Sequence, residues 1–344
     1  MSAKILFLSH VFAPGIGGIE LYSQLLIEAF REAGHEVRLL TMQPGGPDDG
    51  SEFTIVRRPS VTELLTQHRW ADVVFENNLC LRLGWPKLLF GKPSIVILQT
   101  WVVPLDSQPT LATQLKAAWL AKTDRVIAIS TAIQETCWPK ALLIGNSYDD
   151  KVFTARAVER SKDFVFIGRL VSDKGAHLAI RAFASLLAAT PAPDIAKATL
   201  TIIGDGPDRA QLEALAASLL APGQVRFVGS MRGAVLAEEL NRHSYQFIPS
   251  RKEPFGIVAL EGIACGLIPI ASDSGGLPYA VGEAGITFRC GNLESLIEAT
   301  RQLLHSPKQQ QACLRAAPAH LAAFSPARIT RQLLEVVASV SSPR

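Results

Sequence analysis

Two glutamates eight residues apart are the most informative pair of side chains in the sequence. Pro254 fits the first turn of a helix, which would place Glu253 just before the helix and Glu261 about two turns inside it. Eight helical residues span about 12 Å, too far for a paired acid and base but suited to two ends of an extended ligand. We expect one carboxylate to accept hydrogen bonds from sugar hydroxyls and the other from a ribose, with the helix N-terminus facing a phosphate. The structural alternative is a capping glutamate and a buried, ion-paired glutamate.

Two cations precede this segment and could neutralise the same anion. Arg169 follows an apolar, strand-like run, and Lys174 comes five residues later, where a helix begins. A guanidinium and an ammonium are complementary groups for a diphosphate. Another turn, Gly204-Asp205-Gly206, ends the next strand, where a backbone without side chains lets a ligand approach closely. A solvated basic pair is the alternative for the cations, and a helix-capping role is the alternative for Asp205.

A further glycine-rich turn follows the first strand and contains Gly17 and Gly18. Such a turn exposes backbone amides to an anion, although the same glycines could simply form a tight turn. Glu20 occupies the third glycine position of a dinucleotide fingerprint, and the second strand ends in Thr41-Met42-Gln43 without an acidic residue for a ribose. Binding of a nicotinamide dinucleotide is therefore disfavoured.

Strands and helices alternate along the whole chain, as in parallel α/β sheets. The clearest helix is expected over residues 20–33, and a charged, aperiodic stretch at 146–162 is expected to link two domains. We predict the fold class α/β, with two Rossmann-like doubly wound parallel-sheet domains, 1–150 and 151–344, facing a central cleft. The last helix, about 326–340, could pack back on the first domain. The expected strands are 5–9, 36–41, 54–57, 73–76, 94–99, 126–130, 164–167, 200–203, 225–228, 246–249, 268–272 and 286–288.

The composition of the chain limits the classes of function that it can have. Hydrophobic residues make up 48% of the chain and charged residues 19%, so a large core is expected. A formal charge of only +3 argues against a nucleic-acid binder. Five scattered cysteines without a CxxC pair, and histidines without ligand spacing, indicate neither a disulfide framework nor a metal site. No apolar stretch is long enough to span a membrane. We expect a cytoplasmic protein, with peripheral contact at the inner face of the membrane left open.

Together these motifs resemble one enzyme family. GGIE from Gly17, GRL with a following KG at 168–175, GDGP from Gly204, EPFGIVALEG at 253–262 and GGLP from Gly275 occur in this order. The set is similar to the retaining GT-B glycosyltransferases of family GT4 and covers nearly the whole chain. The resemblance implies transfer of a hexose-type sugar from a nucleotide diphosphate sugar to a hydroxyl of a glycan, a lipid-linked or a small-molecule acceptor. It implies front-face attack and neither a metal ion nor another cofactor.

Residue roles follow from the resemblance. Arg169 and Lys174 match cations that neutralise the donor diphosphate and stabilise the leaving group. Glu253 matches the carboxylate that contacts the donor sugar, so the catalytic residues implied are these three. Glu261 matches the carboxylate that holds the ribose. The other donor-binding residues expected are Gly17, Gly18, Gly204, Asp205, Gly206, Val228, Gly229, Met231, Phe255, Gly256, Ile257 and Val258.

Two positions depart from the family pattern. Similar enzymes often place a histidine after the strand at 94–99, where this chain has Gln99-Thr100-Trp101. Gln99 could donate to a sugar hydroxyl and Trp101 could stack on a sugar face. Tyr279 stands where an acidic residue is usual, a change expected to affect packing rather than chemistry. His10 is a candidate for the acceptor side, although a locally bonded histidine at a strand end is the more ordinary interpretation.

Other functions stay open. The missing histidine also fits a non-catalytic, nucleotide-sugar-binding subunit, and the two-domain plan also fits a nucleotide-sugar epimerase. Residues 115–122, with Trp119 beside Lys116 and Lys122, could form an amphipathic surface that touches a membrane, or a packed helix with solvated lysines.

Overall fold

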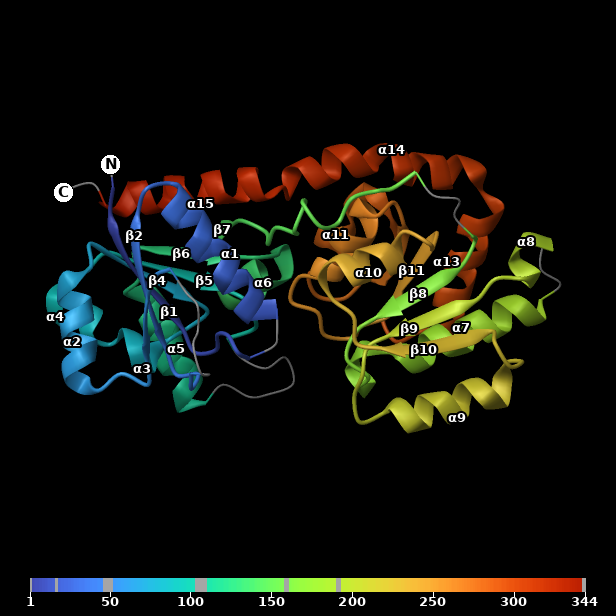
Figure 1. The fold of residues 1–344 in the computed structure, drawn as a ribbon, viewed down its shortest axis with the longest axis horizontal. Helices are drawn as coiled ribbons and strands as arrows, with labels where there is room; N and C mark the ends of the chain where they lie inside the picture. The colour runs from blue at the N-terminus through green and yellow to red at the C-terminus, as the bar shows by residue number, and fades with distance from the viewer. Residues whose placement is uncertain are drawn as a thin grey trace. The chain divides into compact units, whose positions relative to one another are not determined.

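The chain folds into two α/β units. The computed structural model describes residues 2–15, 18–45, 52–102, 110–157, 161–189 and 193–341. Unit 1 comprises Met1–Asn146 and Ala327–Arg344, and unit 2 comprises Ser147–Pro326 (Figure 1). The chain therefore passes from one unit to the other between residues 146 and 147, close to the expected boundary at 150. The final segment, Ala327–Arg344, groups with unit 1. It falls inside the expected range of 151–344 for the second domain, but its helix was also expected to be able to pack back on the first.

Unit 1 has a seven-stranded parallel sheet in the order β3-β2-β1-β4-β5-β6-β7. Strands β1, β2 and β3 extend to one side, and β4 onward to the other, so the topological switch point lies between β1 and β4. Its strands are β1 Lys4–Ser9, β2 Glu36–Thr41, β3 Thr54–Arg57, β4 Val73–Asn77, β5 Ser94–Leu98, β6 Arg125–Ala128 and β7 Leu142–Leu143. Its helices are α1 Gly18–Glu32, α2 Val61–Trp70, α3 Leu81–Gly84, α4 Pro86–Phe90, α5 Leu111–Ala121, α6 Thr131–Cys137 and α15 Pro326–Ser341.

Both faces of the unit 1 sheet are covered. Leu6 and Leu8 of β1 pack with Leu64 of α2, whereas Phe7 turns to the opposite face and stacks on Phe75 at a centroid separation of 5.3 Å. This double coverage explains why β1 reads as an unbroken apolar run in the sequence.

Unit 2 has a six-stranded parallel sheet in the order β10-β9-β8-β11-β12-β13, with its switch point between β8 and β11. Its strands are β8 Phe164–Ile167, β9 Leu200–Ile203, β10 Val225–Gly229, β11 Tyr245–Ile248, β12 Ile268–Ser272 and β13 Ile286–Phe288. Its helices are η1 Ser172–Lys174, α7 Ala176–Ala188, α8 Pro193–Ala196, α9 Arg209–Leu219, α10 Gly233–Leu240, α11 Ile257–Ala264, α12 Leu277–Val281, η2 Gly282–Ala284, α13 Leu293–His305 and α14 Pro307–Ala323.

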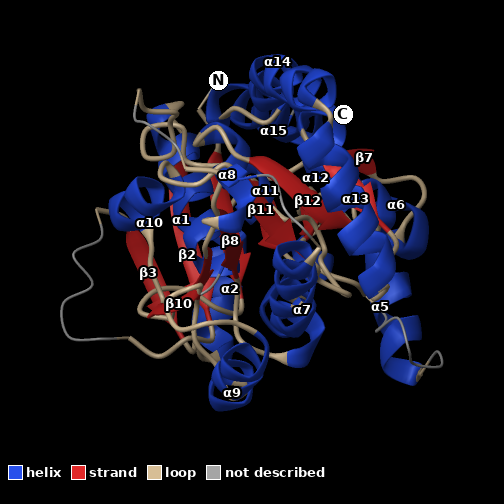
Figure 2. Cartoon of the chain, turned by 90° about the vertical axis from the view of Figure 1, so that its right-hand side faces the viewer, coloured by secondary structure: helices blue, strands red, loops and turns tan. Residues whose placement is uncertain are grey.

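Helices cover the unit 2 sheet as well. Helix α7 packs against α9 and α13 and forms the main core with the strands, while α11 packs against α12 and α14. Phe164 of β8 anchors this core and stacks on Phe247 of β11 at 4.9 Å. Figure 2 shows the red strands enclosed by blue helices. The prediction of an α/β fold with two parallel sheets is confirmed.

Candidate active site

The central feature of unit 2 is the switch point at the carboxyl ends of β8 and β11. Open α/β sheets bind ligands in the crevice beside such a point, because neighbouring loops diverge there. Gly168 and Arg169 follow β8, and the loop from Pro249 to Glu253 follows β11. The sequence placed these segments far apart in the chain, and the sheet brings them to adjacent strands.

Two backbone contacts join the loops. The amide of Arg251 donates to the carbonyl of Asp173 at 2.8 Å. Gly175 has a φ of +74°, and a Cβ added there would lie 2.3 Å from the carbonyl oxygen of Pro249. Glycine is therefore required at 175, both for its backbone conformation and for the close approach of the two loops.

These contacts bring Lys174 and Glu253 together. The ammonium of Lys174 donates to Oε2 of Glu253 at 2.6 Å, and the side chains are 19% and 16% exposed. Partial burial lowers the local dielectric and strengthens such a charge-assisted hydrogen bond. The sequence predicted both residues for the site but not this pairing. Arg169 is exposed, and its guanidinium has no hydrogen-bond or ion-pair partner among the described residues.

The main chain of Glu253 is fixed from its other side by the glycine pair that follows β12. The amide of Gly276 donates to the carbonyl of Glu253 at 2.8 Å. A Cβ on Gly275 would lie 2.2 Å from that same carbonyl oxygen, and one on Gly276 would lie 2.3 Å from the carbonyl oxygen of Pro254. These two glycines therefore let the 274–276 turn support the loop that carries Glu253.

The helix after Glu253 begins later than the sequence predicted. Helix α11 starts at Ile257, with Gly256 as its N-cap at φ 107°, so the placement of Pro254 in the first turn was wrong. Glu261 is the fifth helical residue, a little more than one turn inside. The separation of about 12 Å expected for an unbroken helix therefore does not apply. Of the amides expected to face a ligand, those of Ile257 and Val258 belong to the first turn, where an α-helix leaves N–H groups without an intrahelical acceptor.

Phe255 is buried and packs as part of an aromatic cluster. Its ring centroid lies 6.2 Å from that of Tyr279 and 5.7 Å from that of Phe324, and those two rings are 5.3 Å apart. Tyr279 thus takes part in packing, as the sequence predicted for this departure from the family pattern. Only the main chain of Phe255 is available to line a site.

Glu261 lies half-buried on α11. Removal from water raises the pKa of its carboxyl to about 7, and the negative charge of Asp149 contributes in the same direction. Asp149 was assigned to the linker from sequence, where nothing but its charge could have marked it.

The turn after β9 is shaped by its own neighbours. A Cβ on Gly204, whose φ is +140°, would lie 1.9 Å from the carbonyl oxygen of Gly168, and one on Gly206 would lie 2.4 Å from that of Leu170. Packing against the loop after β8 therefore explains both glycines, where the sequence interpretation invoked close approach of a ligand. Asp205 accepts from the amide of Gly206 at 2.8 Å and pairs with Arg209 at 3.3 Å.

The residues expected beside a nucleotide base lie at the same sheet edge. Val228 and Gly229 end the outermost strand, β10, and Met231 follows it half-buried. The carbonyl of Gly229 accepts from the amide of Gly204 at 2.8 Å, which ties β10 to the turn after β9. The carboxyl ends of β10, β9, β8 and β11 therefore form one continuous edge that carries most of the predicted donor-binding residues.

Unit 1 holds the remaining candidates at the carboxyl edge of its own sheet. Gly17 lies outside the described residues, and Gly18 is the exposed first residue of α1. His10 follows β1 half-buried. Burial lowers the pKa of its imidazole, an effect that Glu76 opposes and Arg82 reinforces.

Gln99 and Trp101 follow β5. Gln99 is 6% exposed, and its Oε1 accepts from Nδ2 of Asn146 at 2.9 Å, whereas its Nε2 has no partner in the described structure. The indole Nε1 of Trp101 is also buried there without a partner. Sequence reasoning assigned Asn146 to the linker, and no local signal marked it as the partner of Gln99.

The described residues contain no group of three or more His, Cys, Asp or Glu side chains arranged to hold a metal ion. None of their helices is both long and apolar enough to cross a membrane.

Comparison with known proteins places the chain in a family. The model of the family described as "Glycosyl transferases group 1" matches residues 148–320. A glycogen synthase of Mycobacterium tuberculosis is 28% identical over 382 residues, covering 91% of this chain and 89% of that protein. A D-inositol 3-phosphate glycosyltransferase of Actinosynnema mirum is 31% identical over 177 residues, covering 49% and 42%.

Solved structures share the fold. Sucrose-phosphate synthase from Thermosynechococcus elongatus superposes with a TM-score of 0.76 at 21% identity, covering 98% of each chain. HepE of Anabaena in complex with UDP gives a TM-score of 0.83 at 18% identity, covering 98% of this chain and 100% of that one. The predicted GT-B fold is thus confirmed. Because the family model spans half of the sequence, the chain belongs to the glycosyl transferases group 1 family and is a glycosyltransferase.

Proposed function

We propose that the protein transfers a hexose from a nucleotide diphosphate sugar to a hydroxyl acceptor, with retention of anomeric configuration and without a metal ion. The observation that carries this proposal is the ion pair of Lys174 and Glu253 at the switch point of unit 2, next to the exposed Arg169. Two cations and a carboxylate at one sheet edge suit a ligand that joins a diphosphate to a polyhydroxylated ring.

Related proteins support the choice of donor. Structures of Anabaena HepE are described as complexes with UDP and glucose and with UDP-glucose. A glycogen synthase is similar over most of its length. UDP-glucose contains both a diphosphate and the ring hydroxyls that the residues of unit 2 are suited to bind.

In this proposal unit 2 binds the donor. Arg169 and Lys174 neutralise the diphosphate, with the amides of Ile257 and Val258 adding the positive end of α11. Glu253 accepts hydrogen bonds from the sugar hydroxyls, and Glu261 accepts from the ribose. The segment from Val228 to Met231 flanks the base.

Unit 1 supplies the acceptor side. Gln99 offers its unpartnered Nε2 to a hydroxyl, and Trp101 and His10 lie at the same sheet edge. The acceptor is a glycan, a lipid-linked sugar or a small molecule. The five cysteines, all within the described residues, form no disulfide, which fits a reducing cytoplasm.

The transfer itself needs no protein nucleophile. The bond between the anomeric carbon and the diphosphate oxygen breaks, and its electron pair stays on the nucleoside diphosphate. The acceptor oxygen attacks the same face of the sugar, forms the new glycosidic bond and passes its proton to the departing phosphate oxygen. Arg169 and Lys174 stabilise the negative charge that develops on that oxygen, which lowers the barrier.

A donor panel tests the proposal. Purified protein is incubated with UDP-, GDP- and ADP-glucose, with α-glucan and simple glycosides as acceptors, with and without EDTA. We expect the enzyme to use one of these donors even when EDTA is present. Proton NMR should show that the new glycosidic bond has the same anomeric configuration as the donor. Glu253→Gln should abolish transfer. Glu238→Gln is the matched control. Glu238 also forms an ion pair, with Arg242 at 2.7 Å, but it lies exposed on α10. An inverted product, or full activity of Glu253→Gln, would overturn the proposal.

A further inference from the structure

Helix α4 in unit 1 buries its charged side chain and exposes its apolar ones. Its lysine, Lys87, is 1% exposed, whereas its neighbours Leu88 and Leu89 are 47% and 66% exposed. A short helix at a protein surface in contact with water normally buries its leucines and leaves its lysine in the solvent, because a buried ammonium loses its hydration. The arrangement here is the reverse and needs specific support.

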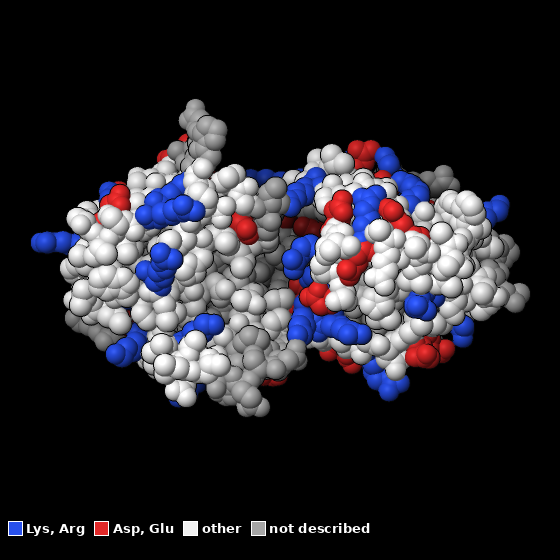
Figure 3. All heavy atoms as spheres, turned by 90° about the horizontal axis from the view of Figure 1, so that it is seen from below, with Lys and Arg blue, Asp and Glu red and all other residues white. Residues whose placement is uncertain are grey.

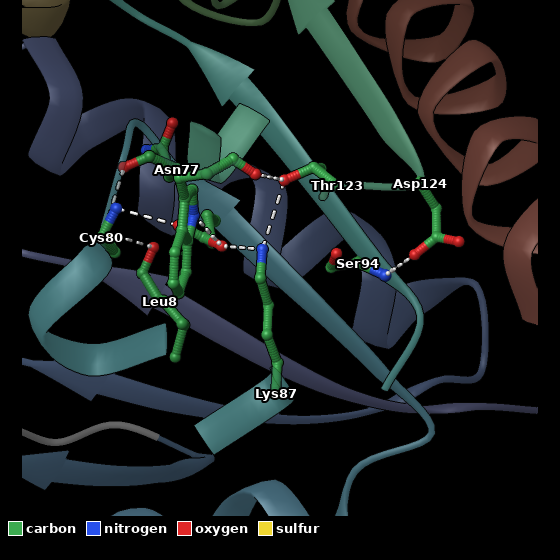
Figure 4. A network of polar contacts seen from close by, with 9 residues as sticks. Leu8, Asn77, Cys80, Lys87, Ser94, Thr123 and Asp124 are labelled. Carbon is green, nitrogen blue, oxygen red and sulfur yellow. Dashed lines mark hydrogen bonds and ion pairs between the residues drawn. The ribbon is translucent and has the colours of Figure 1, made fainter. Parts of the chain in front are cut away.

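A buried carboxylate supplies that support (Figure 4). Oε1 of Glu76 on β4 accepts from Nζ of Lys87 at 2.7 Å and from the indole Nε1 of Trp119 at 3.0 Å. Its Oε2 accepts from the amide of Cys80 at 2.9 Å. Lys87 also donates to Thr123 at 3.3 Å and lies 4.2 Å from the centre of the Trp119 ring. The lysine is thus fully paired inside the unit, and this fixes α4 with its apolar side chains outward.

The exposed apolar side chains of this segment are called the α4 patch: Trp85, Leu88, Leu89 and Phe90. Among the described residues, 11 large apolar side chains are exposed, and four of them fall in these six consecutive positions. Isolated exposed leucines are ordinary, but a cluster with an exposed tryptophan marks a surface that binds something apolar. The sequence interpretation missed this segment and looked instead to residues 115–122, where Trp119 proves to be buried and hydrogen-bonded.

Basic groups outnumber acidic ones on the elements beside the patch. No Asp or Glu occurs from Asn77 to Pro93, whereas Arg82 is exposed on α3. Helix α2 packs against α4, carries the exposed Glu63 in its first turn and ends at the exposed Arg69, whose carbonyl accepts from Nζ of Lys92. On the face drawn in Figure 3, the unit 1 side of the surface shows blue Lys and Arg groups with little red.

We propose that the α4 patch binds an anionic lipid bilayer. Leucine, phenylalanine and tryptophan side chains enter the boundary between headgroups and acyl chains, while Arg82 and Arg69 contact anionic headgroups. The arginines beside the patch favour an anionic bilayer over a second copy of the chain, because two identical patches would bring like charges together. Lipid binding through unit 1 is independent of the donor chemistry assigned to unit 2.

Vesicle sedimentation tests the assignment. The protein is mixed with vesicles of phosphatidylcholine alone or with phosphatidylglycerol, at low and high salt. We expect binding to the anionic vesicles that weakens with salt. Leu88→Glu/Leu89→Glu should lower the affinity at least tenfold and leave transfer to a soluble acceptor unchanged. Leu314→Glu on α14 should bind like the parent, since Leu314 has the same 47% exposure as Leu88.

A second readout locates the contact. Brominated lipids quench an indole that enters the acyl region, and Trp85→Phe should remove most of the vesicle-dependent quenching although Trp70, Trp101, Trp119 and Trp138 remain. Equal vesicle binding by the parent and the double-glutamate variant would overturn the proposal. So would a dimer in light scattering that the same variant dissociates, with no vesicle binding by either protein, because the patch would then be a protein interface.

Discussion

Lys174 and Glu253, 79 residues apart in the chain, meet as an ion pair of 2.6 Å at the switch point of unit 2. A lysine ammonium has three N–H donors. Lys174 can therefore keep its hydrogen bond to Glu253 and donate another to a phosphate oxygen. The pair therefore links the two groups that a sugar diphosphate needs, one for the phosphate and one for the ring.

Removal of the lysine should weaken nucleotide binding. We expect Lys174→Ala to cost about 1.5 to 3 kcal/mol in the affinity for a nucleoside diphosphate, the range for a lost charge-assisted hydrogen bond. Isothermal titration calorimetry measures this directly. Lys197→Ala, which removes an exposed lysine of unit 2, should change nothing. If the effects of Lys174→Ala and Glu253→Gln on the affinity for the nucleotide sugar simply add in the double variant, the two residues act independently.

Glu261 should make nucleotide binding depend on pH near neutrality. The pKa of its carboxyl is about 7, and ribose hydroxyls donate to the ionised form. Binding should therefore tighten by up to about tenfold between pH 6 and pH 8 as the proton leaves. Glu261→Gln controls for titration of the ligand itself and should flatten the difference. A parent protein with the same pH profile as this variant would show that Glu261 does not contact the ligand.

The same carboxyl should also affect stability. Its pKa in the folded protein lies above the ordinary value of 4.5, so the folded state binds more protons than the unfolded state between about pH 4.5 and pH 7. Glu261 therefore lowers the free energy of unfolding as the pH rises through this interval. Urea denaturation at several pH values should show a weaker decline in Glu261→Gln than in the parent.

The turn at Gly275 should govern activity through the main chain of Glu253. Gly275→Ala places a methyl group against the Glu253 carbonyl oxygen, and we expect transfer to fall roughly 10- to 100-fold because the loop must move. Gly223→Ala is the matched control. Gly223 also has a positive φ, of +88°, but open space lies where its Cβ would be. Both variants should lose about 1 kcal/mol of stability from backbone strain, and only the first should lose activity. Equal activity in the two would remove the supporting role of Gly275.

The buried pair of Glu76 and Lys87 should be far more important for stability than an exposed pair of equal length. Glu76→Gln leaves a buried ammonium without its counter-ion, and we expect a loss of about 3 to 5 kcal/mol in the free energy of unfolding. Glu238→Gln breaks a pair of the same 2.7 Å separation whose side chains are both 59% exposed, so it should cost less than about 1 kcal/mol. Chemical denaturation of the two variants gives the comparison. Similar losses would mean that Lys87 finds another partner inside unit 1.

The sheets were the most predictable part of this protein. Strands such as β1 and β8 are buried on both faces, so each appears as a short apolar run that only a strand can explain. Twelve of the thirteen strands were expected within about two residues of their bounds. Strand β7 was missed because it has only two residues, Leu142 and Leu143, and no periodicity can be seen over that length.

The candidate residues could be selected by type and spacing, but their geometry could not. Arg169 and Lys174 were selected as two cations near the end of one strand, and Glu253 and Glu261 as carboxylates eight residues apart around a helix start. Their mutual arrangement depends on which strands are neighbours and on contacts such as that of Gly275 with Glu253, which no local pattern encodes. Pro254 predicted too early a start for α11, because the left-handed conformation of Gly256 delays the helix to Ile257. The burial of Lys87 was equally hidden, because its partner Glu76 belongs to another element.

Helix α15 makes unit 1 discontinuous in the sequence, since its buried face of Ile329, Leu333 and Val337 lies 180 residues and more beyond Asn146. During synthesis on the ribosome, the first 146 residues therefore emerge long before the helix that completes their unit. All of unit 2 is synthesised in the meantime. The unit that is begun first is thus finished last, because unit 1 cannot be completed until α15 has left the ribosome.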